Sequence, residues 1–274
     1  LRLSRAAGSR GQCGGEVAVL TMTGFPAVAG GLPVAHFSEI GSTNAEALSR
    51  AAAGKPEQWI VADRQFSGRG RRGRHWVSEP GNLYASLLLY DPAQASYSPQ
   101  ICFVAALALH DAICDLLPSL GTGRLRVKWP NDLLFDGRKL AGILVEGAGA
   151  GTKQAVVTGI GVNCAHHPAD TSYPVTDFAS ESYTVAPVSL FERLAARMLD
   201  RLAQWHRGSA FSATRKAWLD RAYNLGHEIE VKLPERVLNG RFEEIDGDGA
   251  LVLALANGHR ELIRAGDVFP ADTR

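Results

Sequence analysis

Apolar and polar positions along the first half of the chain predict alternating helices and strands. Ser42 can cap the run of good helix formers that follows it, which predicts a helix over about 43 to 53. Residues 59 to 63 form a short apolar run, and residues 82 to 90 alternate with a period of two, so both segments are predicted strands. The segment 101 to 117 is apolar nearly all round, which is typical of a helix buried against a sheet.

The second half of the chain changes from long elements to short ones. The pattern predicts three further β segments and a helical region with two helices, at 124 to 129, 139 to 147, 154 to 163 and 187 to 222. From about residue 226 the apolar runs are short and are separated by turn signals such as Asn257-Gly258. Four or five such antiparallel strands predict a small β-barrel that follows a larger domain of helices and sheet.

The N-terminal stretch shows neither the helical nor the strand period. Residues 1 to 31 carry seven glycines, so we expect a flexible tail. Met22 is the only methionine before residue 198, which makes it a candidate for the natural start. The predicted organisation has three parts: a tail over 1 to 31, a large α+β domain over 32 to 224 and a barrel over 225 to 274.

Composition and charge exclude several classes of protein. The 274 residues carry a formal net charge of +1, which argues against a dedicated nucleic-acid binder, because non-specific affinity for nucleic acid comes mainly from excess Lys and Arg. The four cysteines, at 13, 102, 114 and 164, form no CxxC pair, so neither a zinc site nor a disulfide framework is indicated. No segment is judged to approach the length of a membrane span, and a cytoplasmic location is the simplest expectation.

The strongest local signal is the segment from Gln65 to Trp76, which reads QFSGRGRRGRHW. Four arginines lie within its residues 69 to 74, interleaved with glycines. Glycine lets the backbone approach a ligand, and the planar guanidinium matches carboxylate and phosphate oxygens. The pattern favours an anion-binding loop, with a solvated charged loop and a nucleic-acid patch as the alternatives.

The letters GRGRRG at 68 to 73 also satisfy the dinucleotide-binding pattern GxGxxG, but the context excludes that interpretation. The fingerprint requires a helix directly after the turn, whose N-terminus receives the pyrophosphate. Here Pro80 and Gly81 lead into a strand instead.

Two further segments carry small residues beside polar ones. In the first, KWPNDL at 128 to 133 is followed by RKLAGILVE at 138 to 146, where Lys139 starts a strand and Gly142 leaves room for a ligand. A solvated lysine at a strand edge is the commoner alternative. In the second, GIGVN at 159 to 163 places glycines in a β-branched run, which indicates either close approach of a ligand or a bulge.

Taken together, these segments resemble the biotin protein ligases, also called biotin–[acetyl-CoA-carboxylase] ligases. The likeness covers about 36 to 270 and rests on four motifs in the family's order: STN at 42 to 44, GRGRRGRHW at 68 to 76, KWPNDL with RKLAGILVE from 128 to 146, and GIGVN at 159 to 163. The resemblance implies a mixed β-sheet flanked by helices, related to class II aminoacyl-tRNA synthetases, with a C-terminal SH3-like barrel.

The resemblance also implies a chemistry with two half-reactions. Biotin carboxylate attacks the α-phosphorus of MgATP to give biotinyl-5′-AMP, and a lysine of a biotin carboxyl carrier protein then displaces AMP. ATP and Mg²⁺ are therefore the expected co-substrates, biotin and the carrier protein the expected partners, with no nucleic acid and no membrane. Members of the family can form homodimers through the central sheet, so the oligomeric state stays open.

The family match assigns roles to residues at matching positions. The expected catalytic residues are Lys139 and Arg69. The expected biotin-binding residues are Ser42, Thr43, Asn44, Gln65, Gly68, Arg69, Gly70, Arg71, Lys139 and Gly142. The expected ATP- or adenylate-binding residues are Arg71, Arg72, Arg74, Trp76, Asn131, Asp132, Gly159 and Asn163. Mg²⁺ is expected to be held mainly by the ATP phosphates in the region of Asp132, and Trp76 is equally well explained as a core aromatic.

Two alternatives remain beside this interpretation. A lipoate or octanoate ligase would use the same adenylate logic, but a linear acyl chain needs no polar partners such as Ser42, Thr43 and Gln65. A DNA-binding biotin sensor would need a helix-turn-helix, and the residues before Ser42 show no helical period. We therefore expect a ligase without repressor function.

Overall fold

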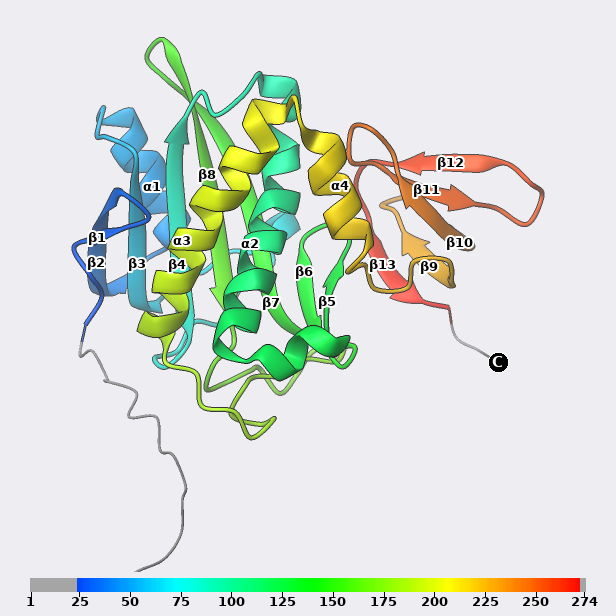
Figure 1. The fold of residues 1–274 in the computed structure, drawn as a ribbon, viewed down its shortest axis with the longest axis horizontal. Coiled ribbons are helices and arrows are strands. Elements are labelled where there is room, and N and C mark those ends of the chain that lie inside the picture. Colours follow the sequence, from blue (N-terminus) through cyan, green and yellow to red (C-terminus); the bar gives the residue numbers. More distant parts are fainter. Residues whose placement is uncertain (1–23, 272–274) are drawn as a thin grey trace, which may run out of the picture.

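The computed structural model describes residues 24–271 and is built around one large mixed sheet (Figure 1). Its strands, in spatial order, are β1 (Val28–Ala29), β2 (Leu32–Ile40), β3 (Gln58–Gln65), β4 (Leu83–Tyr90), β8 (Lys153–Val162), β7 (Arg138–Ala150), β6 (Asp132–Phe135) and β5 (Leu125–Lys128). The pair β2 and β3 is parallel, and all other neighbours are antiparallel. The sheet therefore places β3 and β4, which flank the arginine-rich segment, next to β8 and β7, which carry two of the motifs.

Helices cover both faces of this sheet, and their composition reflects how deeply they are buried. On one face lie α2 (Ile101–Leu116) and α3 (Pro187–Trp205), which contribute to the main core together with α4 (Phe211–Leu219). On the other face α1 (Thr43–Ala52) buries Ala47 and Ala51 against Ile60, Leu88 and Val157. Four short 3₁₀ segments complete the helical part: Arg71–Gly73, Ala95–Gln100, Pro118–Thr122 and His206–Gly208.

The segment from Ala95 to Leu116 corrects the expectation that no stretch reaches the length of a membrane span. Among the described residues it is the one helical segment long and apolar enough by composition to cross a bilayer. However, 67% of its most apolar window is buried inside the protein, where α2 packs against the sheet and α3. Packing in the core accounts for its apolar composition.

The C-terminal part forms a separate five-stranded antiparallel sheet in the order β12 (Arg260–Ile263), β11 (Leu251–Ala254), β10 (Val237–Ile245), β9 (Glu228–Lys232) and β13 (Asp267–Pro270). It lies beside α4 and the β5 edge of the main sheet (Figure 1). Trp129, directly after β5, donates a hydrogen bond of 3.1 Å from Nε1 to the carbonyl of Gly249. The mixed sheet, its flanking helices and this second sheet confirm the predicted fold class.

The beginning of the chain departs from the prediction. The strand β2 was not expected, because its exposed and half-buried positions do not alternate regularly. The tail boundary at residue 31 is wrong, since β1 pairs with β2 through a turn at Gly30 and Gly31, both with positive φ. The candidate start at Met22 and the rest of the predicted tail, residues 1–23, lie outside the described residues.

Candidate active site

The floor of the candidate site is one face of the β4–β8–β7 sheet. Tyr84 pairs with Gly161 and Ser86 with Gly159, while Gly142 of β7 pairs with Gly161 from the other side. Because side chains alternate along a strand, paired residues point to the same face. This is the face that α1 covers, and its three glycines leave the sheet without side chains at the centre of the site.

A β-bulge brings Lys139 onto this floor. In the pairing of β6 with β7, Leu133 faces Ala141 and Leu134 faces Lys139, so Leu140 is an extra residue on β7. A bulge shifts the alternation by one residue. Lys139 consequently shares a face with Gly142, and a β-carbon built at Gly142 would lie 3.4 Å from Lys139 Cε. The Lys139 ammonium lies 2.8 Å from Asp132 Oδ1.

Polar side chains at the start of α1 form one end of the site. The Ser42 hydroxyl caps the helix by accepting from the Ala45 amide at 3.4 Å. Thr43 donates to Gln65 Oε1 from both its amide and its hydroxyl, at 2.9 and 3.1 Å. The hydroxyl of buried Ser86, on β4, lies 2.8 Å from Thr43 Oγ1 and 2.6 Å from Asn44 Oδ1, and its single hydrogen is donated to one of these two oxygens. This network fixes the orientation of a cluster of hydroxyl and amide groups that faces the cavity.

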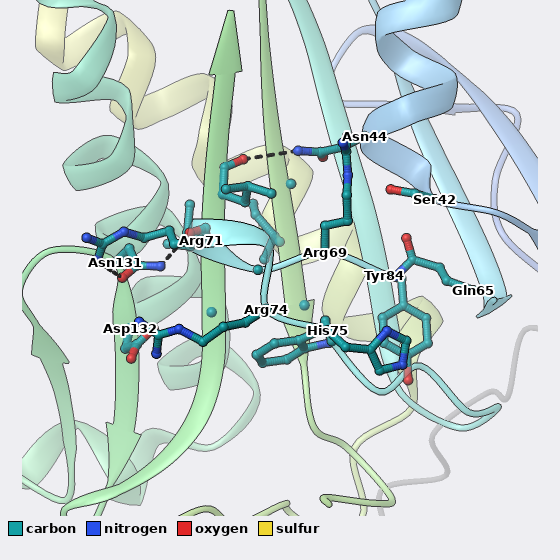
Figure 2. A pocket seen from close by; sticks show the side chains of 18 of the residues that line it. Ser42, Asn44, Gln65, Arg69, Arg71, Arg74, His75, Tyr84, Asn131 and Asp132 are labelled. Carbon is teal, nitrogen blue, oxygen red and sulfur yellow. Dashed lines mark hydrogen bonds between the residues drawn. The ribbon is translucent and has the colours of Figure 1, made fainter. Parts of the chain in front are cut away.

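The arginine loop, residues 66–75, crosses the site between this polar end and the opposite one (Figure 2). Three of its arginines each contact a different side chain. Arg69 lies 3.2 Å from Glu146 Oε2, Arg71 donates to Asn131 Oδ1 at 3.0 Å, and Arg74 donates to Asp267 Oδ2 at 2.5 Å. Arg71 also donates to the carbonyl of Gly266 at 3.2 Å. The C-terminal sheet therefore holds part of this loop.

Burial and pairing act in opposite directions on these charges. Burial lowers the pKa of Arg71, whereas the hydrogen bond to Asp267 raises that of Arg74. Burial alone would raise the pKa of the Asp267 carboxyl, but the hydrogen bond from Arg74 and the charges of Arg74, Arg72 and Arg71 overcome this effect and lower it. Asp267 is thus a stable anion that competes with any ligand for these guanidinium groups.

Trp76 fills the space over the glycine floor. A β-carbon built at Gly161 would lie 2.7 Å from the indole, and one at Gly142 would lie 3.0 Å from it. The Lys139 ammonium lies 5.4 Å from the centroids of both the Trp76 and the Tyr173 rings, within reach of a cation–π contact. Trp76 Nε1 is buried and has no hydrogen-bond partner among the described residues. The indole N–H is therefore available to a ligand in the cavity.

The cavity formed by these elements, called here the first cavity, has a free volume of about 90 Å³. Ligand sites for small molecules usually measure about 300–1,000 Å³. Arg69 and Arg74 of the loop and Trp76, directly after it, line the cavity and take up part of its space. A ligand with the size of an adenylate would require the loop to move outward.

Most of the residues predicted for the site meet at the first cavity. Its lining contains these predicted residues: Ser42, Thr43, Asn44, Gln65, Arg69, Gly70, Arg71, Arg74, Trp76, Asn131, Asp132, Lys139, Gly142 and Gly159. They come from α1, β3, the arginine loop, the β5–β6 turn, β7 and β8.

Three predicted residues, Gly68, Arg72 and Asn163, do not line it. Gly68 is buried against the loop's own backbone, where a β-carbon would lie 2.5 Å from the Trp76 carbonyl oxygen. Arg72 points to Asp267, at 3.2 Å. Asn163 is buried, and its side chain donates to the Thr176 carbonyl at 3.0 Å, so it supports the chain rather than facing a nucleotide.

Sequence reasoning missed the counter-charges and the aromatic walls of the site. Glu146 accepts from Asn44 Nδ2 at 2.8 Å as well as pairing with Arg69. Tyr84, Tyr173 and Asp267 line the first cavity. The alternation of β4 could have placed Tyr84 on the side of the site, but no local signal marks Tyr173 or Asp267, because both come from irregular or distant segments.

The arrangement can hold two anions close together in a partly dry site. Arg69, Arg71, Arg74 and Lys139 converge on one cavity, and a charged group in such surroundings stabilises negative charge more strongly than it would in water. At the opposite end, neutral hydroxyl and amide groups suit an uncharged polar ligand group. The site therefore suits a small molecule with a carboxylate at one end and an uncharged polar head at the other, next to a phosphate.

Comparisons with known proteins agree with this geometry. A sequence model described as "Biotin/lipoate A/B protein ligase family" matches residues 37–163, and one described as "Biotin protein ligase C terminal domain" matches residues 225–269. A biotin–[acetyl-CoA-carboxylase] ligase of Paracoccus denitrificans is 41% identical over 83% of this chain and 96% of its own length. One of Mycobacterium tuberculosis is 32% identical over 84% and 86%. A biotin protein ligase of Aquifex aeolicus, solved with biotin and ATP, is 22% identical with a TM-score of 0.75 over 87% of this chain and 99% of that one, which shows the shared fold.

Proposed function

The chain belongs to the biotin protein ligase family, and from this premise we propose that it activates biotin with ATP and transfers the biotinyl group to a lysine of a carrier protein. The observation that carries the proposal is the convergence of Lys139 with three arginines on one cavity beside a neutral polar pocket. The relatives at 41% and 32% identity carry the name of this activity.

In the first half-reaction the protein must bring two anions together. A carboxylate oxygen of biotin attacks the α-phosphorus of ATP, the bond from that phosphorus to the bridging oxygen breaks, and pyrophosphate leaves with the electron pair. Fixed cations offset the repulsion between the reactants and the charge that develops on the phosphate oxygens. Lys139, held by Asp132 at the centre of the cavity, and Arg69 are the residues placed to do this.

The polar end of the site suits the ureido ring of biotin. The hydroxyl of Ser42 accepts from the helix backbone and still has its own hydrogen to donate. Thr43 donates two hydrogen bonds to Gln65 Oε1 that a ureido group could replace. A linear acyl chain has no polar group that could bond the Ser42 hydroxyl or replace the bonds from Thr43 to Gln65, so it would gain nothing from this end of the site. This favours biotin over lipoate, as does the match of residues 225–269 to the biotin ligase C-terminal domain.

Mg²⁺ would enter the site with ATP. This ion prefers oxygen ligands and is commonly bound by one or two carboxylates together with substrate phosphates. Asp132 and Asp267 are the carboxylates in the lining of the first cavity, so they are the residues that could share the ion with the phosphates. Asp132 already pairs with Lys139, and Asp267 pairs with Arg72 and Arg74. Each carboxylate would therefore have to leave its present partner in order to bind Mg²⁺.

In the second half-reaction the amine of the carrier lysine attacks the carbonyl of the mixed anhydride, and AMP leaves with the electron pair of the broken C–O bond. The donor residues that held the phosphate then stabilise AMP as the leaving group. A biotin carboxyl carrier domain of a biotin-dependent carboxylase is the proposed partner.

ATP–pyrophosphate exchange with biotin or with lipoate, followed by transfer of labelled biotin to a carrier domain, tests the proposal. Exchange that depends on biotin, with label on the carrier lysine, supports it. Exchange that depends on lipoate alone would replace it with the lipoate alternative. Salt-dependent binding to DNA containing a biotin-operon sequence would add the sensor function that we do not expect.

A further inference from the structure

A single carboxylate connects the neutral polar end of the site to the arginine loop. Glu146, on β7, accepts from Asn44 Nδ2 at 2.8 Å, and the same carboxylate oxygen, Oε2, lies 3.2 Å from Nη2 of Arg69. Glu146 is 102 positions from Asn44 and 77 from Arg69 along the chain. One oxygen atom therefore joins the start of α1, the strand β7 and the loop.

Asn44 is held on several sides, so it fixes the position of Glu146. Asn44 is buried, its Oδ1 lies 2.6 Å from the Ser86 hydroxyl, and its Nδ2 also donates to the Leu144 carbonyl at 3.3 Å. It lies over Gly159, where a β-carbon would be only 2.8 Å from Asn44 Cγ. The amide consequently has little room to turn, and its Nδ2 presents a fixed donor to the carboxylate.

Arg69 can hold a ligand at the same time as it contacts Glu146. A guanidinium carries several N–H donors in one plane, and within residues 24–271 the only side-chain partner of Arg69 is Glu146, through Nη2. Arg69 lines the first cavity, whereas Glu146 does not. The carboxylate thus holds the guanidinium from outside the cavity and leaves Nε and Nη1 for an anion inside it.

A fixed guanidinium matters because Arg69 stands on a glycine-rich loop. Its side chain is 44% exposed, and a long exposed side chain loses rotamer freedom when it binds an anion. A partner that orients the guanidinium before the reaction removes this cost from the reaction step. Glu146 is placed to do this for Arg69, as Asp132 is for Lys139 at 2.8 Å.

We propose that Glu146 is a positioning residue for adenylate formation, which aims Arg69 at the biotin carboxylate and the α-phosphate and is itself anchored by Asn44. This inference rests on the proposed ligase function and adds to it a residue that acts only through Arg69. As the bond from the α-phosphorus to the bridging oxygen breaks, the guanidinium offsets the charge on the phosphate oxygens without having to be reoriented.

The variant Glu146→Gln separates the two contacts of the carboxylate. The amide oxygen of glutamine can still accept from Asn44 Nδ2, so the polar end of the site is kept, but the charge that holds Arg69 is removed. We therefore expect kcat of adenylate formation to fall about tenfold, which is within the range of coupling between residues of one hydrogen-bond network. The KM for biotin should stay near the wild-type value. A purely structural change would instead weaken biotin binding together with the rate.

The experiment measures formation of biotinyl-5′-AMP by the full chain at increasing biotin concentrations. It compares the wild type, Glu146→Gln, Arg69→Gln and the double variant. Because Glu146 acts through Arg69, the loss caused by Glu146→Gln should disappear in the Arg69→Gln background.

The chain offers a matched control on the helix that carries Asn44. Glu46 pairs with Arg50 at 2.7 Å, and its side chain is exposed to nearly the same extent as that of Glu146, 29% against 27%. It does not line the first cavity. Glu46→Gln removes a comparable ion pair and should keep the wild-type kcat and KM.

Three results would overturn the inference. They are an unchanged kcat in Glu146→Gln, a raised kcat, which would make Glu146 an inhibitory partner of Arg69, and an equal fold-loss in both backgrounds, which would show that Glu146 acts independently of Arg69. If thermal unfolding shows that Glu146→Gln does not fold, Glu146→Asp replaces it in the same comparison, because the shorter carboxylate is drawn back from Arg69. If the wild-type protein forms no biotinyl-AMP from biotin and ATP, the proposed function fails instead, so the two failures are distinguishable.

Discussion

Lys139 Nζ and Asp132 Oδ1 lie 2.8 Å apart although these residues are not partners in the β6–β7 register, where Asp132 faces Gly142 and Lys139 faces Leu134. The extra residue, Leu140, turns Lys139 toward the face on which Asp132 and Gly142 lie. The ion pair therefore depends on the bulge, and the bulge sets the direction of the ammonium.

Replacement of Lys139 by alanine should slow adenylate formation by about 10²–10³-fold, as loss of one preorganised donor to a developing charge usually does. Single-turnover formation of biotinyl-AMP measures the effect, and circular dichroism checks the fold. Lys153→Ala is the control, because Lys153 is an exposed lysine at the start of β8 outside the lining of the first cavity. Near-wild-type kinetics in Lys139→Ala would refute the role of this residue.

A methyl group on the glycine floor should weaken biotin binding. In Gly161→Ala the new β-carbon would lie 2.7 Å from the Trp76 indole, so the ring and its loop must shift at a cost of about 1–3 kcal/mol, which is typical of overpacking. Titration calorimetry with biotin measures the change. Gly149→Ala on β7 is the control, since a β-carbon there meets nothing within 4 Å. Equal affinities in the two variants would contradict the prediction.

Ligand binding should protect the arginine loop from trypsin. Its arginines are accessible to protease in part, and the loop must move for a large ligand to enter the small first cavity. We expect slower cleavage after Arg69 and Arg74 in the presence of biotinyl-AMP, because contacts with the ligand order the loop. Cleavage after Arg207, in the connection between α3 and α4, serves as the internal reference and should not change. Cleavage of the loop at the same rate with and without ligand would contradict ordering of the loop by the ligand.

Acid should weaken the contact between the arginine loop and the C-terminal sheet. The pKa of Asp267 is lower in the folded protein than its ordinary value, so its contribution to stability is present above the unfolded-state pKa of about 3.9 and is lost as the pH falls through the folded-state value. Urea unfolding over a range of pH should show that the wild type loses stability relative to Asp267→Asn in this acidic window. A difference between the two proteins that stays constant with pH would exclude Asp267 as the titrating group.

The local motifs contain most of the predicted residues that line the first cavity, because each motif carries its own chemistry. The loop with Arg69 and Arg71 and the strand with Lys139 were both identified from residue types and spacing. The strands that carry KWPNDL, RKLAGILVE and GIGVN are also neighbours in the sheet. Segments identified one at a time in the sequence therefore meet at one cavity.

The rest depended on contacts that no local pattern encodes. Strict alternation through 139 to 147 would place Lys139 and Gly142 on opposite faces, and only the pairing with β6 creates the bulge that joins them. Asp267 holds Arg74 across 193 positions of sequence, and the sequence shows no periodicity that links them. A polar residue after a glycine-containing strand suggests a ligand contact, but the amide of Asn163 donates to the buried Thr176 carbonyl, a contact that no local pattern reveals.

The hydrogen bond from Trp129 to the Gly249 carbonyl has a consequence for the interpretation of sequence variants. The turn around Gly249 is far along the chain from every motif, and its sequence alone would class it as a tolerant loop. Its backbone nevertheless holds the tryptophan that directly precedes Pro130, Asn131 and Asp132. A harmful variant at 246 to 250 should therefore be interpreted as a change in the position of the β5–β6 turn. It should not be grouped with variants that only destabilise the C-terminal sheet.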